Sequence, residues 1–257
     1  IQIESQTVGT SGGDKVVFED SALESAVREA LQMEDNAEIT EHAVSDITEL
    51  NLSDFRIISL KGLEAFTNLK KLDLSNNNFY DLAPLSGLTK MEELDLSRNR
   101  ITDISPLEKL TSLKTLILAD NLVENVHVLE KFPDLSVLDI QRLPLNDFSG
   151  IAKIGGLEQL NMNGTVVADG TLNFLQSHRK LTMLYAKGCN LTSTEGLCGD
   201  ELQFLNLADN QLTVIPDIHF ARLQSADFSE NPLTNISGLQ SAEWIEKLDL
   251  SNCNLNS

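Results

Sequence analysis

The sequence predicts an α/β solenoid, a right-handed superhelix of short coils with a parallel β-sheet on its concave side. Three observations predict it. A segment of about 22 residues recurs along most of the 257-residue chain, leucine and asparagine stand at fixed places within it, and only 5% of the residues are aromatic. Because such a chain stacks leucines from coil to coil, an apolar content of 41% is enough for one continuous core.

The repeat is clearest in residues 69–79, LKKLDLSNNNF, and 91–101, MEELDLSRNRI, which follow the leucine-rich template LxxLxLxxNxL. Successive copies start 22 residues apart five times, and then 24, 21, 21 and 22 residues apart. The central LxL of each copy predicts a short strand whose leucines point into the solenoid, because side chains alternate along a strand. The ten copies start at Ile47, Leu69, Met91, Leu113, Leu135, Leu157, Leu181, Leu202, Leu223 and Ile245.

One position after each strand, which we call the ladder position, holds asparagine in half of the copies. We expect these amides to be buried and to bond backbone groups of adjacent coils that would otherwise lack partners. The asparagines are Asn77, Asn99, Asn121, Asn210 and Asn231. The other copies carry Phe55, Leu143, Thr165, Cys189 and Cys253, and we expect the two cysteines to be buried substitutes for asparagine. With Cys198 they form no CxxC or Cys/His pattern, which argues against a disulfide framework or a zinc site.

The segments between the strands, such as DLAPLSGL at 81–88 and DISPLEKL at 103–110, predict short 3₁₀ or extended returns on the convex side. Residues 16–46 predict an N-terminal helical cap, with one helix at 21–33 that starts with a Ser21/Glu24 capping box and a second at 39–47 that starts at Thr40. We expect a flexible lead-in at 1–15 and about ten coils at 47–257. The last coil lacks a capping motif, so we expect further chain or another subunit to cover it.

The 22-residue period, the return motif D-[IL]-x-P-L-x-x-L at 81–88 and 103–110, and the cap VVFEDSALESAVREAL at 16–31 resemble the internalin-like leucine-rich-repeat (LRR) proteins of bacteria. The resemblance covers nearly the whole chain. It implies a secreted or surface-attached protein that binds host or environmental proteins through its concave face. Members of this family commonly continue into immunoglobulin-like and wall-anchoring regions, which these residues do not include.

The residues on either side of each inward leucine are predicted to face the concave surface, and most are polar. Two groups are apolar instead: Ile117 with Val137, and Met183 with Tyr185 and Phe204. Exposed apolar residues on a hydrophilic sheet are typical anchors of a binding site, and Tyr185 and Phe204 are the first candidates. Alternatively, both groups are scattered surface residues or pack under the irregular sixth and seventh coils. Among the polar residues of this face we include Asp95, Asp139 and Asp227 as candidate ligand contacts.

Several function classes are disfavoured. A net charge of −20 repels nucleic acid and anionic lipid, and no segment has the roughly 18 consecutive apolar residues of a membrane span. Asp73 and Asp95, or Asp227 and Asp249, should lie side by side, but two carboxylates supply too few oxygens for calcium, so no metal or cofactor is predicted. No nucleophile–base constellation or phosphate loop is present, so we predict no enzyme. The four histidines, expected on the surface or in turns, are His42, His127, His178 and His219.

The sequence therefore predicts a protein-binding recognition module of a bacterial surface or secreted LRR protein. At roughly 4.8 Å per strand, ten coils give a sheet on the order of 43 Å across, which suits a protein domain or a long glycan better than a metabolite. The alternatives are an intracellular LRR adaptor and the substrate-targeting region of a larger enzyme. The sequence leaves open the identity of the ligand, the choice between protein and glycan, and the oligomeric state.

Overall fold

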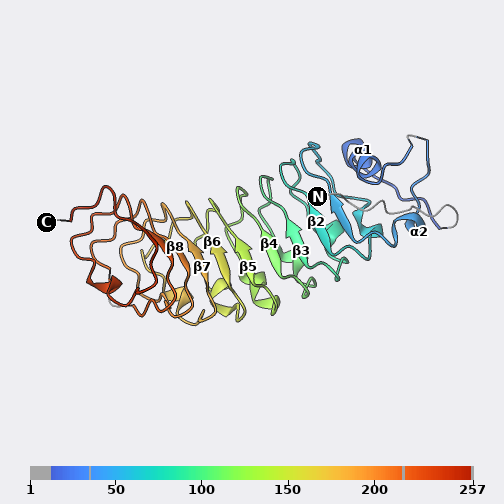
Figure 1. The fold of residues 1–257 in the computed structure, drawn as a ribbon. Helices are drawn as coiled ribbons and strands as arrows, with labels where there is room; N and C mark the ends of the chain where they lie inside the picture. Colours follow the sequence, from blue (N-terminus) through green and yellow to red (C-terminus); the bar gives the residue numbers. More distant parts are fainter. Residues whose placement is uncertain (1–12, 35, 216–217, 256–257) are drawn as a thin grey trace.

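The chain folds into one elongated solenoid, seen in a computed structural model that describes residues 13–34, 36–215 and 218–255 (Figure 1). Ten three-residue strands form a single parallel sheet, and each strand pairs with the next one in the sequence. The predicted LRR solenoid is therefore confirmed. The strands are β1 (Glu49–Asn51), β2 (Lys71–Asp73), β3 (Glu93–Asp95), β4 (Thr115–Ile117), β5 (Val137–Asp139), β6 (Gln159–Asn161), β7 (Met183–Tyr185), β8 (Phe204–Asn206), β9 (Ser225–Asp227) and β10 (Lys247–Asp249).

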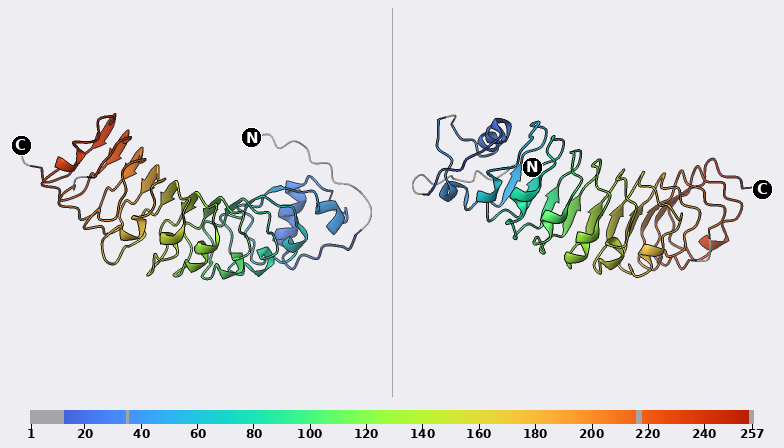
Figure 2. Two further views of the ribbon diagram at one scale, coloured as in Figure 1. Left: turned by 90° about the horizontal axis from the view of Figure 1, so that it is seen from below. Right: turned by 180° about the vertical axis from the view of Figure 1, so that it is seen from behind.

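The returns between strands are short, as predicted, and they lie on the side opposite the sheet (Figure 2). Seven of them contain a 3₁₀ turn in the described residues, and the others are extended or bent. Because a 3₁₀ turn takes up less width than an α-helix, the two sides of the coil differ little in spacing and the solenoid curves gently. The turns are η1 (Leu63–Ala65), η2 (Ala83–Leu85), η3 (Ser105–Leu107), η4 (His127–Lys131), η5 (Ile151–Lys153), η6 (Asn173–Leu175) and η7 (Ser237–Leu239).

The middle residue of each strand points into the core. It is a buried leucine in β1 to β8 and a buried alanine, Ala226, in β9. Leu248 of β10 is the exception, with 42% of its surface exposed, because β10 has a neighbouring strand on one side within the described residues. Every interior coil thus covers the leucines of the coil on each side of it, which is how a solenoid builds a core from units that have none alone.

The asparagine ladder forms as predicted. Asn121 Nδ2 donates to Leu96 O at 2.8 Å and to Leu118 O at 3.0 Å, so one amide bonds the carbonyls of two consecutive coils. Its Oδ1 accepts the Ile101 amide N–H at 3.0 Å. All five ladder asparagines are buried and donate in the same way. They act as structural groups that bond the backbone of adjacent coils, as predicted.

The substitutes at the ladder position behave differently from one another. Cys189 is buried, its thiol donates to Met162 O at 3.1 Å, and burial raises its pKa to about 11. Thr165 Oγ1 donates to Ile140 O at 2.6 Å. Cys253 makes the equivalent contact, with Phe228 O at 3.4 Å, but it is only half-buried, because it lies in the terminal described coil. Thus Cys189 replaces asparagine as expected, whereas the expected burial of Cys253 was wrong.

The N-terminal cap consists of α1 (Ser21–Ala30) and α2 (Glu41–Val44), which are both shorter than predicted. The predicted capping box at Ser21 and Glu24 was wrong, because Asp20 is the N-cap residue and its Oδ1 accepts the Ala22 N–H at 2.8 Å. Glu24 instead pairs with Arg28 at 2.7 Å. Thr40 does cap α2, where it accepts the Ala43 N–H. The predicted lead-in at 1–15 lies mostly outside the described residues.

Asp20 caps α1 because it also joins the cap to the first coil. Its Oδ2 accepts the Ile58 N–H at 2.6 Å and the Ser59 N–H at 3.2 Å. One carboxylate therefore satisfies amides on both sides of the junction between cap and solenoid, and the side chain is buried there. Ser21, one residue later, has no such partner in the first coil.

His178 is the one histidine whose prediction was wrong, since its side chain is buried at 3% exposure, whereas His42, His127 and His219 are exposed. Its Nε2 lies 3.1 Å from Ile151 O of the preceding coil. Burial lowers the pKa of this imidazole below its ordinary value of 6.5, because the cation would lose its hydration.

We expect Asn121→Ala to lower the free energy of unfolding by about 3 kcal/mol, since Leu96 O, Leu118 O and the Ile101 N–H would lose a buried partner. Asn78→Ala is the matched control, because that asparagine is exposed and next to the ladder, and a change within about 0.5 kcal/mol is expected. Urea denaturation followed by circular dichroism measures both. Equal effects would show that the ladder does not stabilise the coils.

His178 should make the protein less stable at low pH. Above pH 6.5 the imidazole is neutral in both states, so stability does not depend on it there; as the pH falls below 6.5, the unfolded chain binds the proton first and stability decreases. We expect the wild type to lose more thermal stability than His178→Gln between pH 7.5 and 5.5. His42→Gln, at an exposed position, should follow the wild type, and a parallel loss in all three proteins would contradict the assignment.

Candidate protein-binding surface

The concave face consists of two columns of outward side chains, one from the first and one from the last residue of each strand. Neighbouring strands pair without any shift, so residues of one column lie directly beside each other, as in Glu49↔Lys71 and Asn51↔Asp73. The same register continues through all ten strands. The predicted concave columns are therefore confirmed as a geometrical arrangement, in which the position of a residue in its repeat determines its neighbours.

Met183, Tyr185 and Phe204, which we call the aromatic patch, meet on β7 and β8. Met183 and Phe204 are direct neighbours across the two strands, and Tyr185 lies between Asn161 and Asn206. All three side chains are half-buried. The middle residues of both strands are buried leucines, so the patch is held on a rigid part of the sheet. The structure thus places the first candidates, Tyr185 and Phe204, on adjacent strands as diagonal neighbours.

Ile117 and Val137 do not face each other directly. Ile117 lies between Asp95 and Asp139, and Val137 between Thr115 and Gln159, so the two apolar residues are diagonal neighbours. Ile117 lines two shallow depressions, one of about 230 Å³ over β1 to β4 and one of about 250 Å³ at the ends of β1 to β5. These residues form a second, smaller apolar area, separated from the aromatic patch by β6.

The candidate aspartates also hold the turns that follow the strands. Asp95 Oδ1 accepts the Ser97 N–H at 2.9 Å and the Ser97 hydroxyl at 2.7 Å, and Asp227 bonds Ser229 in the same way. Asp139 accepts the Gln141 N–H at 3.0 Å. Sequence reasoning missed this role, although the recurring D-x-S of LDLS is a signature of such an Asx turn.

Burial affects the charge of two of these aspartates. Partial desolvation raises the pKa of both the Asp95 and the Asp139 carboxyl, and the hydrogen bonds to Ser97 and Gln141 oppose that rise. The neighbouring Asp73 carboxylate raises the pKa of Asp95 further. Asp139 and Asp227 also bond an asparagine of an adjacent strand, Asn161 at 3.1 Å and Asn206 at 3.3 Å. The aspartates are therefore part of the framework, and they present charge at fixed positions.

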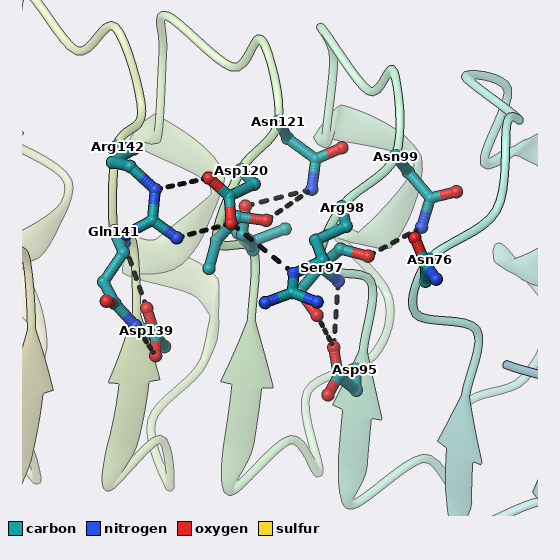
Figure 3. Close-up of polar contacts among 12 residues, drawn as sticks. Asn76, Asp95, Ser97, Arg98, Asn99, Asp120, Asn121, Asp139, Gln141 and Arg142 are labelled. Carbon is teal, nitrogen blue, oxygen red and sulfur yellow. Dashed lines mark hydrogen bonds and ion pairs between the residues drawn. The ribbon is translucent and has the colours of Figure 1, made fainter. Parts of the chain in front are cut away.

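A second row of side chains runs along the turns at the ends of the strands (Figure 3). Its residues adopt left-handed backbone conformations, among them Arg98, Asp120 and Arg142, with φ of 56°, 57° and 54°. Arg142 donates two hydrogen bonds to Asp120 from the next coil, and Arg98 Nε lies 3.8 Å from the same carboxylate on the other side (Figure 3). These partners hold the pKa of Asp120 below its ordinary value. The row fixes the rim of the concave face over β3 to β5.

No candidate metal-binding cluster accompanies this surface in the described parts of the chain. There, no three His, Cys, Asp or Glu side chains lie close enough together to hold a metal ion. The Asp73/Asp95 and Asp227/Asp249 pairs do lie side by side as predicted, and Oδ1 of each carboxylate accepts the N–H two residues ahead. Among the helices that the structure describes, none has the length and apolarity needed to cross a membrane.

Known proteins match the chain through its repeats and its fold. The family model for Leucine Rich repeats (2 copies) matches residues 46–87, 67–109 and 89–131, and the model for a single Leucine Rich Repeat matches 201–221. No curated protein sequence matches the chain. These matches and the ten stacked coils define the chain as a leucine-rich-repeat solenoid.

Among solved structures, an internalin of Listeria monocytogenes, inlF, is 21% identical, with a TM-score of 0.58 over 93% of this chain and 91% of that one. The functional domain of InlJ from the same organism, which includes a cysteine ladder, is 22% identical, with a TM-score of 0.70 over 98% of this chain and 64% of that one. A Leptospira interrogans LRR protein is 19% identical, with a TM-score of 0.57 over 83% and 68% of the two chains. The fold of this chain is therefore internalin-like.

The role of the aspartates in the turns can be tested with two substitutions at one position. Asp95→Ala removes the acceptor of the Ser97 N–H and hydroxyl and should lower the free energy of unfolding by about 1–2 kcal/mol. Asp95→Asn should cost much less, because Asn51 and Asn206 already accept the same N–H in their own coils. Chemical denaturation distinguishes the two variants. If asparagine is as destabilising as alanine, the turn depends on charge and not on the acceptor.

Proposed function

We propose that this chain is a protein-recognition module whose concave face binds a partner protein, within a bacterial protein that is secreted or attached to the cell surface. The observation that carries the proposal is the aromatic patch. At the positions of Tyr185 and Phe204, the neighbouring strands carry Asn161, Asn206 and Ser225, so the solenoid itself does not need an aromatic residue there. Aromatic side chains in a polar surround are the usual centre of a protein interface.

The shape and charge of the sheet support the same proposal. Ten strands present an open, gently curved face without a deep enclosed cavity among the depressions on its described part, which suits a protein surface better than a small molecule. The net charge of −20 favours a partner with a basic surface. The negative field of the protein attracts such a partner over a long range, which accelerates the encounter, and it repels acidic competitors. The asparagines beside Tyr185 supply a polar rim that can form hydrogen bonds with such a partner.

The proposed location rests on the structural neighbours. Two are internalins of Listeria monocytogenes, and one is an LRR protein of Leptospira interrogans. An internalin-like fold favours a secreted or surface location, where a rigid solenoid can recognise proteins of a host or of the environment.

We expect a Tyr185→Asn/Phe204→Ser variant to lose its partner, because these substitutions copy neighbouring strands and remove the two aromatic side chains of the aromatic patch. The measurement is affinity capture from host-cell surface extract and, in parallel, from bacterial lysate, followed by titration of the captured protein. Affinity should fall at least about tenfold, as for the loss of a hot spot. Trp244→Gln, which removes an exposed aromatic side chain outside the sheet and outside the first two coils, is the control and should bind normally.

Two results would contradict the proposal. Equal binding by the wild type and the Tyr185→Asn/Phe204→Ser variant would show that the aromatic patch is not the binding site. Loss of binding in Trp244→Gln alone would place this partner on another face of the molecule.

A further inference from the structure

The first two coils carry two large apolar side chains that are mostly exposed, and neither lies on the concave face. Ile58 is 66% exposed and Tyr80 is 68% exposed. Ile58 lies between β1 and η1, and Tyr80 lies between β2 and η2, so both are on the flank that connects the sheet to the convex turns. They line the same open hollow of about 490 Å³. We call the residues that line it the flank hollow: Glu19, Ile58, Ser59, Leu60, Lys61, Glu64, Tyr80, Asp81, Ala83 and Pro84.

Comparison of the coils with one another shows that the solenoid does not require apolar residues at this place. Ile58 and Tyr80 each stand three residues after the ladder position of their coil. In the later coils that the structure describes, the same position is small or polar: Thr102, Glu124, Asn146, Ala168, Thr192, Thr213 and Thr234. At this position of the described repeats, large exposed apolar side chains thus occur in the two coils beside the cap and not in the later coils. Apolar side chains that the fold leaves exposed and does not require are typical of a surface that contacts another molecule.

The flank hollow is rigid, because the cap holds one wall of it. Asp20 accepts the backbone N–H groups of Ile58 and Ser59 at 2.6 and 3.2 Å. Glu19 accepts the Ser59 hydroxyl at 3.1 Å and pairs with Lys61 at 3.4 Å. A wall fixed by four contacts loses little conformational freedom when a partner binds, which favours affinity.

The charges around the hollow indicate which partner fits. Three carboxylates, of Glu19, Glu64 and Asp81, line it with a single ammonium group, that of Lys61, which leaves an excess of two negative charges. Because Lys61 already pairs with Glu19, the carboxylates of Glu64 and Asp81 have no cation beside them among the described ion pairs. An apolar residue between basic residues would match both the apolar walls and the acidic rim.

We propose that the flank hollow is a second protein-docking surface, separate from the concave face, and that it accepts a segment of a partner protein in which an apolar side chain is flanked by lysine or arginine. The apolar side chain packs between Ile58 and Tyr80. The flanking cations pair with Glu64 and Asp81. The cap and the first two coils therefore act together as one recognition unit.

The test uses three synthetic peptides and the whole chain. The first, acetyl-Lys-Lys-Leu-Phe-Lys-Lys-amide, has both required features. The second replaces its four lysines with glutamate, and the third replaces Leu-Phe with Gly-Ser. Titration is followed by the backbone amide signals of Ile58, Ser59 and Tyr80 in ¹⁵N-labelled protein. We expect the first peptide to shift these signals in a saturable way and the other two to bind at least about tenfold more weakly.

The decisive variant is Ile58→Thr/Tyr80→Thr, which copies the residue of four later coils and should leave the fold intact. Its affinity for the first peptide should fall at least about tenfold. The matched control, Leu122→Asn/Val166→Asn, removes two other exposed apolar side chains, and its affinity should be unchanged. Circular dichroism and thermal melting of both variants confirm that the comparison concerns folded protein.

Several results would overturn the proposal. These are equal binding by the two variants, saturable binding of the acidic peptide to this hollow, and peptide-induced shifts centred on β7 and β8 instead of the flank. A fourth contradicting result would come from sedimentation equilibrium. If the wild type forms a dimer and the Ile58→Thr/Tyr80→Thr variant does not, a second copy of this chain occupies the hollow. The aromatic patch on the concave face is intact in both variants, so this test is independent of the proposed function.

Discussion

No coil of this chain can bury its own leucines, so the whole structure depends on the stacking of each coil on the next. The inward leucine of one strand covers that of the next, and the ladder asparagine bonds carbonyls of two consecutive coils at once. A buried carbonyl without a partner is costly, so the amide fixes both the spacing and the direction of the chain after each strand. Where the ladder carries Thr165 or Cys189, one donor to a carbonyl of the preceding coil is kept.

Stacking leaves the outward positions free to vary. The core uses the middle residue of each strand, while the first and last residues determine what a partner meets. Tyr185 occupies a place where adjacent coils carry asparagine, and Tyr80 occupies one where later coils carry mainly threonine. In both cases the same backbone holds a polar or an aromatic side chain. Binding surfaces can therefore arise on the concave face and on the flank without changes in the core.

The concave aspartates link structure and charge. Each one bonds the backbone of its own turn through Oδ1, and in Asp95 the other oxygen has no partner among the described hydrogen bonds. The carboxylates are thus held in regular rows, and partial burial, with a smaller contribution from their mutual repulsion, raises the pKa of Asp95. A basic partner would offset the repulsion between the carboxylates. The negative face is accordingly a consequence of the turn chemistry as well as a feature that favours such a partner.

The repeat by itself determined most of the fold. A period near 22 residues specifies the strands, their parallel register and the buried asparagines, because all of these follow from local sequence repeated at constant spacing. It also placed Met183 beside Phe204, since equivalent positions in adjacent coils are neighbours, and it placed Tyr185 diagonal to Phe204. Tertiary structure decided the features that depend on contacts outside the repeat pattern. Asp20 and not Ser21 caps α1, because only Asp20 reaches the amides of Ile58 and Ser59, 38 and 39 residues away.

Contacts outside the repeat pattern also account for the other features that the sequence did not predict. His178 is buried because its ring reaches Ile151 O in the preceding coil, a contact that no local pattern encodes. Ile58 and Tyr80 share a hollow only because the cap and the first coils enclose it together. Periodic sequence predicts what every coil has in common, whereas the individual side chains of two coils and a cap become one surface only when the chain has folded.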